Sequence, residues 1–156
     1  MPSWKALAAA GIVLMLIAGT TGALAQSKKP DDIVGIWESD NLKIDMFNAG
    51  PEYNARLLWG DKVVEADGKT FKLDAHNPDP SLRSRSLKGI VLIKGLTWKD
   101  GKYTGGTLYD GRSGQSYNCD AEVAEGELRL RGYVGVSLLG RTVVFRRASA
   151  ASGSKS

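Results

Sequence analysis

The chain has 156 residues, with 21 lysine and arginine residues against 17 aspartate and glutamate residues, and a single cysteine. One cysteine cannot form an intrachain disulfide, so the core of the fold must supply the stability. The weak positive charge is not gathered in one dense run of arginines, which argues against nucleic acid as a partner.

The first 25 residues have the three parts of a secretory signal peptide. Lys5 supplies the positive start, Ala6 to Ile17 is an uncharged apolar run, and Ala23-Leu24-Ala25 is a small-x-small cleavage site. The alternative is an uncleaved anchor, because Ala6 to Ala25 is uncharged over about the span of a bilayer. No cysteine follows the apolar run, so a lipid-anchored lipoprotein is not expected.

Cleavage after Ala25 leaves 156 − 25 = 131 residues, enough for one domain with a real core. We expect a signal peptide over 1–25, a polar linker over 26–32, a β domain over 33–147 and a disordered tail over 148–156. The mature protein is then periplasmic or secreted, and it is not integral to the membrane.

Apolar and polar residues alternate along the domain with a period of two, which predicts short strands. The clearest stretch is Leu128 to Arg147, where two alternating runs joined at Ser137 to Gly140 predict an antiparallel hairpin. No stretch has helical periodicity, and Gly105-Gly106 predicts a bulge or bend within a strand. We therefore expect an all-β fold of about eight to ten strands, either a sandwich or, favoured by the glycine bends, an up-and-down barrel. Strands are expected over 33–38, 42–46, 53–59, 62–65, 70–73, 90–93, 102–109, 117–123, 128–137 and 142–146.

Residues 74–86 interrupt the strand pattern with two prolines, one histidine and two arginines. Proline removes an amide donor and biases the preceding residue to extended geometry, so this segment is predicted to be a surface loop. We hypothesise that Asn77 to Arg85 packs over one end of the barrel as a lid. It would pair there with residues of the last hairpin, near Arg131 and Arg141.

Gly35-Ile36-Trp37 on the first expected strand resembles the lipocalin-type signature. In that signature a tryptophan near the closed end of the barrel is covered by an arginine from the final strand, here Arg141 or Arg146. A guanidinium group stacks well on an indole ring and would seal the barrel end. The motif is short, and the alternative is that Trp37 is an ordinary core residue.

Four separated motifs, in order, closely resemble a bacterial exported family known as domain of unknown function 2147. They are Asn77 to Arg85, Gly105 to Asp110, Gly114 to Tyr117 and Arg131 to Thr142. The resemblance covers nearly the whole mature chain and implies a lipocalin-like (calycin) β-barrel in the cell envelope with no assigned activity. The family often carries a cysteine pair in the region corresponding to Met46 to Trp59, and this chain has no cysteine there.

Few residues suggest chemistry. His76 is the only histidine and no cysteine is near it, so neither a metal site, a cofactor nor a catalytic residue is expected. Cys119 lies on the apolar face of its strand and is interpreted as a buried, inert side chain.

Five arginines present two alternatives. In the first, the five side chains converge on an anionic group, because arginine binds carboxylate or phosphate with two parallel hydrogen bonds. In the second, they stay solvated and pair with Asp79 or Asp110. The five are Arg83, Arg85, Arg129, Arg131 and Arg141. The candidate ligand-binding or signature residues as a whole are Trp37, Asn77, Asp79, Arg83, Arg85, Tyr109, Arg131, Tyr133 and Arg141.

Three classes of function remain open. The first is a binding module, in which an apolar barrel interior holds a small amphipathic or acidic molecule whose head meets arginine. The second is an envelope interaction protein with a filled interior, which uses the Asn77 to Arg85 loop as its contact surface. An enzyme comes third, because the sequence has no convincing catalytic constellation. The interior volume separates the first two, since an eight-stranded barrel is either filled by side chains or holds one small ligand.

We predict that the mature protein begins at Gln26, because Ala23-Leu24-Ala25 directly follows the apolar run and its Gly/Thr stretch. N-terminal sequencing of the exported form is the measurement. A sequence that starts at Met1, or protein held in the inner membrane, would refute the prediction.

Overall fold

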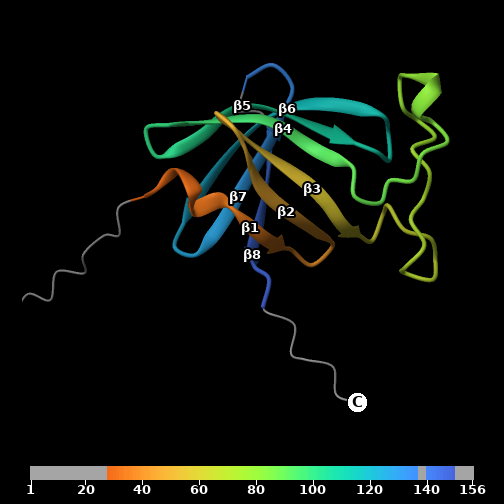
Figure 1. The fold of residues 1–156 in the computed structure, drawn as a ribbon, viewed down its shortest axis with the longest axis horizontal. Coiled ribbons are helices and arrows are strands. Elements are labelled where there is room, and N and C mark those ends of the chain that lie inside the picture. The colour runs from red at the N-terminus through yellow and green to blue at the C-terminus, as the bar shows by residue number, and fades with distance from the viewer. Residues whose placement is uncertain (1–27, 137–139, 150–156) are drawn as a thin grey trace, which may run out of the picture.

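The structure, a computed structural model, describes residues 28–136 and 140–149 (Figure 1). Eight antiparallel strands close into one up-and-down barrel, in which each strand pairs with the next and the last returns to the first. The strands are β1 Gly35–Glu38, β2 Leu42–Ala49, β3 Glu52–Gly60, β4 Val91–Lys99, β5 Lys102–Asp110, β6 Gln115–Ala124, β7 Glu127–Tyr133 and β8 Arg141–Arg147. The short 3-10 helices η1 Pro30–Ile33 and η2 Pro80–Leu82 complete the elements of these two ranges. The predicted barrel is confirmed, whereas the signal peptide, the first two residues of the predicted linker, and most of the predicted tail and last hairpin turn lie outside these ranges.

One end of the barrel is sealed by η1 and by aromatic side chains. The ring of Tyr103 packs against Tyr53 and Trp98, with centroid distances of 5.4 and 4.8 Å. Its hydroxyl donates to the carbonyl oxygen of Pro30 at 2.7 Å, and Ile33 is completely buried. Residues 30–33 therefore belong to the barrel end, where the sequence predicted linker and the start of a strand.

Trp37 is covered by an arginine of the last strand, as in the lipocalin-type signature, but the arginine is Arg147 and not Arg141 or Arg146. The guanidinium carbon of Arg147 lies 3.9 Å from the centroid of the Trp37 ring, and the two residues are opposite each other in the β1–β8 register. Gly35 permits this approach, since a Cβ atom there would lie 2.5 Å from a guanidinium nitrogen of Arg147. The expected kind of contact is present, with the partner at a different position.

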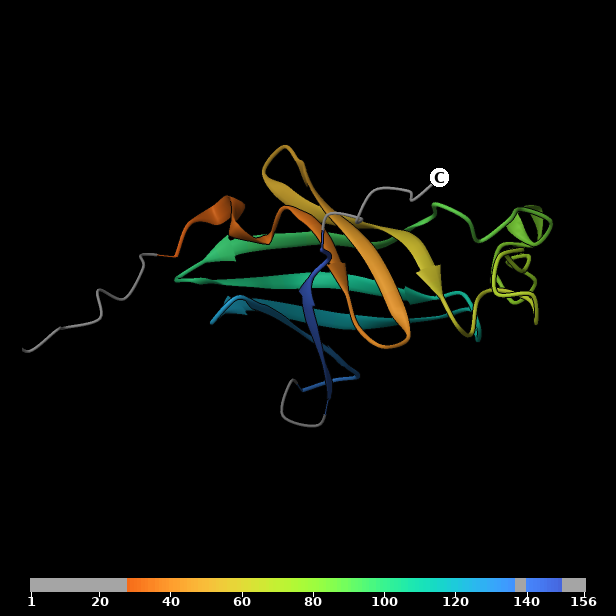
Figure 2. The same cartoon turned by 90° about the horizontal axis from the view of Figure 1, so that it is seen from below.

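The connection between β3 and β4 lies outside the barrel. Figure 2 shows it at the end of the molecule opposite η1. Strands were predicted over 62–65 and 70–73, but this segment has only two isolated bridges, Val64 with Phe71 and Leu73 with Ser86. The Asp67 carboxylate accepts hydrogen bonds from the backbone N–H groups of Lys69 and Thr70 and so holds a tight turn between Val64 and Phe71. No barrel strand pairs with this turn to extend the bridge into a ladder.

Two glycine sites bend the central strands. The β5–β6 register shifts between Tyr103 and Gly106, so the predicted bulge at Gly105-Gly106 is confirmed. A Cβ atom at Gly106 would lie 2.7 Å from the side chain of Leu96. Strand β4 continues to Lys99, well past the predicted end at residue 93, because its bend at Gly95 is held by a hydrogen bond to the Asn54 side chain.

We predict that Trp37→Ala lowers the free energy of unfolding by about 3–5 kcal/mol, the range for removing a large buried aromatic side chain. Urea denaturation is the measurement. Ile36→Ala is the matched control on the same strand, because Ile36 is 44% exposed and its truncation should change stability by about 0.5 kcal/mol or less. Equal losses for the two variants would contradict the prediction.

Candidate functional site: the open end of the barrel

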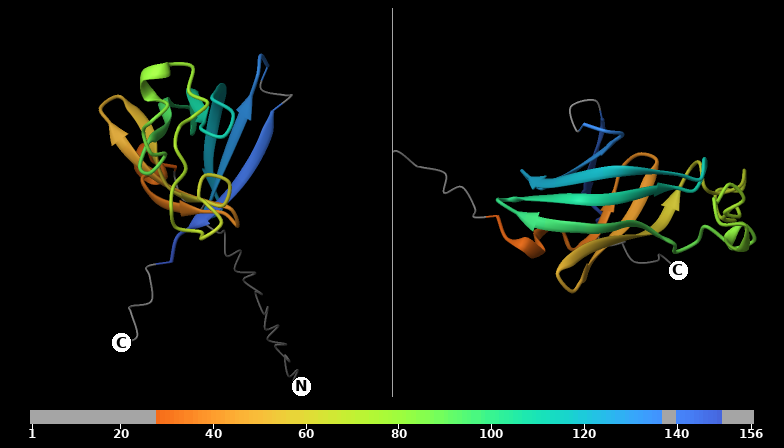
Figure 3. Two further views of the ribbon diagram at one scale, coloured as in Figure 1. Left: turned by 90° about the vertical axis from the view of Figure 1, so that its right-hand side faces the viewer. Right: turned by 90° about the horizontal axis from the view of Figure 1, so that it is seen from above.

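The half of the barrel remote from η1 is hollow. A cavity of about 810 Å³ opens at the end where β3, β5 and β7 finish. Figure 3 (left) looks onto this end of the barrel. Eight-stranded barrels can hold one small ligand, and this volume lies within the range of small-molecule sites. The interior of this barrel is therefore filled at one end and open at the other.

The cavity wall is apolar because strand residues point alternately to the two faces of a sheet. On β7, Leu128 and Leu130 are buried inside the barrel, whereas Arg129 and Arg131 alternate with them and lie on the outer face. The same alternation supplies the other strands of the wall. The apolar wall residues include Leu57, Leu92, Leu108, Leu130 and Val143.

The rim of the cavity is polar. Arg112 binds Asp110 with two parallel hydrogen bonds, 3.0 Å from Nε to Oδ1 and 2.9 Å from Nη2 to Oδ2. Burial raises the pKa of Asp110, but these bonds outweigh burial and hold that pKa below its ordinary value. Lys62 lies 3.7 Å from Asp61, so it is paired as well.

Arg141 is the rim cation that forms no ion pair with any residue of the ranges 28–136 and 140–149. It is exposed at the start of β8, and the rim tyrosines Tyr117 and Tyr133 line the same opening. After the pairs at Asp61 and Asp110 are discounted, the rim carries one net positive charge. It therefore favours an anionic group at the mouth of an apolar cavity.

The five arginines do not converge on one site. On the outer face, Arg129 lies 3.1 Å from Glu125 and 3.5 Å from Glu127, and Arg131 donates to the Thr142 hydroxyl at 3.1 Å. Arg83 and Arg85 belong to the β3–β4 connection, and neither lines the cavity. The alternative in which the five arginines converge on one anionic group does not hold, because strand alternation and the chain path send their side chains to three different places. Of the five, only Arg141 lines the cavity.

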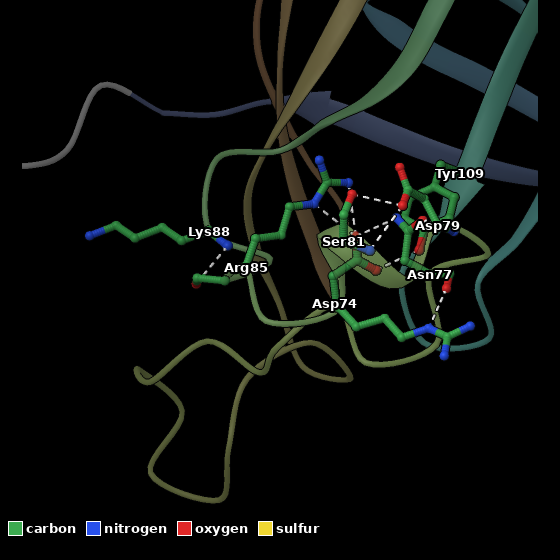
Figure 4. A network of polar contacts seen from close by, with 9 residues as sticks. Asp74, Asn77, Asp79, Ser81, Arg85, Lys88 and Tyr109 are labelled. Carbon is green, nitrogen blue, oxygen red and sulfur yellow. Dashed lines mark hydrogen bonds and ion pairs between the residues drawn. The ribbon is translucent and has the colours of Figure 1, made fainter.

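Asp74 is the centre of a buried polar network in the β3–β4 connection (Figure 4). Its carboxylate accepts hydrogen bonds from the Asn77 amide at 2.8 Å and from Arg85 Nε at 2.9 Å, and Arg85 Nη2 is 2.8 Å away. The Tyr109 hydroxyl, from β5, donates to the other carboxylate oxygen. Because Tyr109 also lines the cavity, this network ties the loop to the cavity wall.

The loop docks on the turn between β5 and β6. A Cβ atom at Gly114 would overlap the carbonyl oxygen of His76, and one at Gly111 would lie 2.5 Å from Leu87. The loop therefore packs on Tyr109 and this turn, and not on the last hairpin as the lid hypothesis expected. Leu87 lines the cavity, whereas none of residues 74–86 does, so the loop flanks the mouth and does not plug it.

Electrostatics favour the charged form of Asp74 and the neutral form of Tyr109. Burial raises the pKa of Asp74, but the hydrogen bonds from Tyr109, Asn77 and Arg85 outweigh burial and lower it. Burial and the bond to Asp74 raise the pKa of Tyr109 to about 12. The lowered carboxyl pKa gives stability that is lost as the pH falls through that pKa, and the raised phenol pKa gives stability lost as the pH rises towards about 12. The loop is therefore held across the neutral range.

Of the nine candidate residues, Tyr109, Tyr133 and Arg141 line the cavity. Trp37 lies at the sealed end, Arg131 on the outer wall, and the four loop residues are Asn77, Asp79, Arg83 and Arg85. Sequence reasoning missed Asp74 and the leucines of the wall. The period of two could have identified the leucines, but no local pattern marks an aspartate that accepts a hydrogen bond from a tyrosine 35 residues away.

No group of three or more potential metal ligands occurs among the histidine, cysteine, aspartate and glutamate side chains of residues 28–136 and 140–149. His76 is exposed, and Cys119 is completely buried, which raises the pKa of its thiol to about 12. None of the helices in 28–136 and 140–149 has the length and apolar character needed to cross a membrane.

An eight-stranded up-and-down barrel, sealed at one end by a Gly-x-Trp strand under an arginine and hollow at the other, is a lipocalin-like fold. The structure is similar to that of HP1028 from Helicobacter pylori, described as a member of the lipocalin family. The two share 25% sequence identity with a TM-score of 0.65, over 76% of this chain and 84% of the other.

Residues 35–147 match the model of an uncharacterised protein family conserved in bacteria, DUF2147, and the chain belongs to that family. A comparison with curated protein sequences finds no match. The family resemblance and the lipocalin-like fold expected from the sequence are both confirmed.

We predict that Asp74→Ala lowers the free energy of unfolding by about 3 kcal/mol, because it leaves the Tyr109 hydroxyl and the Asn77 amide without their buried acceptor. It should also speed protease cutting between residues 74 and 86. Asp79→Ala is the control, since Asp79 is an exposed residue of the same loop and its carboxylate bonds only within the loop, to Ser81. Cutting that is equally fast in both variants would show that Asp74 does not hold the loop.

Proposed function

We propose that this protein binds a small amphipathic molecule with an acidic head group in the barrel cavity, in the bacterial envelope. The observation that carries the proposal is the pairing of an apolar wall with a rim whose net positive charge comes from Arg141. An apolar chain would lie against the wall leucines. A carboxylate or phosphate at the mouth would accept hydrogen bonds from Arg141.

The size and shape of the site support a small ligand. A cavity of about 810 Å³ suits a molecule of drug size, and specificity at such sites comes from a few polar groups at fixed positions. Tyr117 and Tyr133 lie on the rim with Arg141 and could donate hydrogen bonds to the same head group. The ligand therefore needs both an apolar part and an anionic end.

An envelope location is supported by the sequence alone. The first 25 residues have the arrangement of a cleaved signal peptide, and export would place the mature barrel in the periplasm or outside the cell. The family is conserved in bacteria, and the similar HP1028 belongs to the lipocalin family. Binding in the cavity is preferred to contact through the Asn77 to Arg85 loop, because the polar groups of that loop bond mainly to one another.

Binding of laurate and of lauryl alcohol by purified protein, measured by calorimetry, tests the proposal. Arg141→Ala should weaken laurate binding about tenfold or more and leave the alcohol nearly unaffected, because only the carboxylate has a charge-assisted bond to lose. Leu130→Trp should weaken both ligands by filling the cavity, and Arg129→Ala on the outer face should weaken neither. Failure of both ligands to bind wild type, together with native mass spectra that show no co-purifying molecule, would refute the proposal.

A further inference from the structure

The barrel is closed by a very short seam. Strand β1 has four residues, and only Trp37 and Glu38 pair with β8, opposite Arg147 and Arg146. The chain then turns into β2, so residues 141–145 of β8 pair with β7 on one side and, within 28–136 and 140–149, with no strand on the other. Figure 3 (left) shows β7 and β8, in blue, standing apart from the orange and gold strands β2 and β3.

Backbone groups on this free edge point into the seam. The N–H of Ala148 donates to the carbonyl oxygen of Ile36 across the seam at 3.0 Å. In an antiparallel strand the N–H and C=O of alternate residues face the same side, so those of Val144 and Thr142 face the seam as well. Two donors and two acceptors thus lie along the edge at the spacing of a strand.

The edge borders a groove. A hollow of about 580 Å³ lies between residues 142–144 of β8 and the turn from Glu38 to Asn41. Val143 and Val144 both line this hollow and are 41% and 45% exposed overall, and Val143 also lines the barrel cavity. Proteins usually protect an exposed edge with charged residues, proline or a bulge, and the Thr142-Val143-Val144 edge has none of these.

We propose that this edge binds an extended peptide segment, which adds a strand to β8. A peptide has N–H and C=O groups at strand spacing and so supplies the hydrogen-bond partners that the edge lacks. A lipid chain cannot hydrogen-bond to the backbone of Thr142 or Val144. The opposite wall of the groove, from Glu38 to Asn41, leaves room for one strand beside β8 and not for a sheet. A strand already paired in another sheet would bring its neighbouring strand against that wall, so the occupant is a single extended segment.

The charge of the groove adds a preference to the peptide. The lining carries both signs of charge, because Arg146 and Arg147 lie on the β8 side. On the opposite wall Asp40 is exposed and forms no ion pair with any residue whose position the structure gives, whereas Glu38 pairs with Lys43 at 3.3 Å. A lysine or arginine of the peptide would reach Asp40. Valine or threonine would lie opposite Val143 and Val144, as cross-strand β-branched pairs do. The partner is therefore an extended, β-branched segment with one basic residue.

A labelled synthetic peptide, Thr-Lys-Val-Thr-Val-Thr, tests the proposal by fluorescence anisotropy and by amide exchange of the full mature chain. Wild type and Val144→Thr should bind it equally. Val144→Pro should bind it about tenfold more weakly, because proline removes a donor that faces the seam and takes no part in the β7–β8 ladder. The amides of Thr142 and Val144 should exchange quickly in the free protein and slowly in the complex. Asp40→Asn should weaken this peptide but not its lysine-to-glutamine counterpart.

Several results would overturn the proposal. One is the absence of saturable binding and of amide protection, and another is equal binding by Val144→Pro. A third is a concentration-dependent dimer that protects the same amides without peptide, which would assign the edge to a second copy of the chain. Thr142→Pro removes a donor on the same side of β8, and its peptide binding is measured instead if Val144→Pro fails to fold. Urea denaturation of each proline variant shows whether the barrel is intact, and this measurement depends neither on the edge nor on a ligand in the cavity.

Discussion

The stack of Arg147 on Trp37 is the interaction on which this structure depends. A barrel must join its last strand to its first, and here only two residue pairs do so. The guanidinium of Arg147 adds to them by covering the indole and by donating to the carbonyl oxygens of Asp32 and Val34, which precede β1. The closure and the sealed end of the barrel thus share one side chain.

The short closure divides the barrel into two halves with different roles. Near η1, aromatic rings and the buried Ile33 fill the interior, and the indole N–H of Trp37 donates to the Ile33 carbonyl oxygen at 2.7 Å. Towards the other end the strands separate, and the interior becomes a cavity with an apolar wall. Buried side chains fill the first half, and the cavity of the second half is where the proposed ligand would lie.

The polar network around Asp74 has a supporting role at that open end. It fixes a long connection against Tyr109 and the β5–β6 turn, the same turn that holds the Asp110–Arg112 pair of the rim. The rim is therefore braced from outside the barrel. For the proposed ligand, bracing on the β5–β6 side of the rim would favour selective binding over loose apolar contact.

Local pattern determined much of this fold. The period of two along β2, β3, β6 and β7 predicted the strands and the inward side chains, because the direction of a side chain follows directly from strand geometry. Gly105-Gly106 predicted a bulge for a similarly local reason, and Gly35-Ile36-Trp37 indicated the sealed end. The barrel and its family were therefore accessible from the sequence.

Tertiary structure decided which residues meet. Arg147, and not Arg141 or Arg146, covers Trp37 because the β1–β8 register is the sum of all seven other strand pairings and their bulges. Asp74 became the centre of a network only when the chain brought Tyr109 beside it, and the free edge of β8 exists only because β1 ends at Glu38. Side-chain direction is a property of neighbouring residues, whereas register and strand length depend on the closure of the whole barrel, and no short window of sequence contains that information.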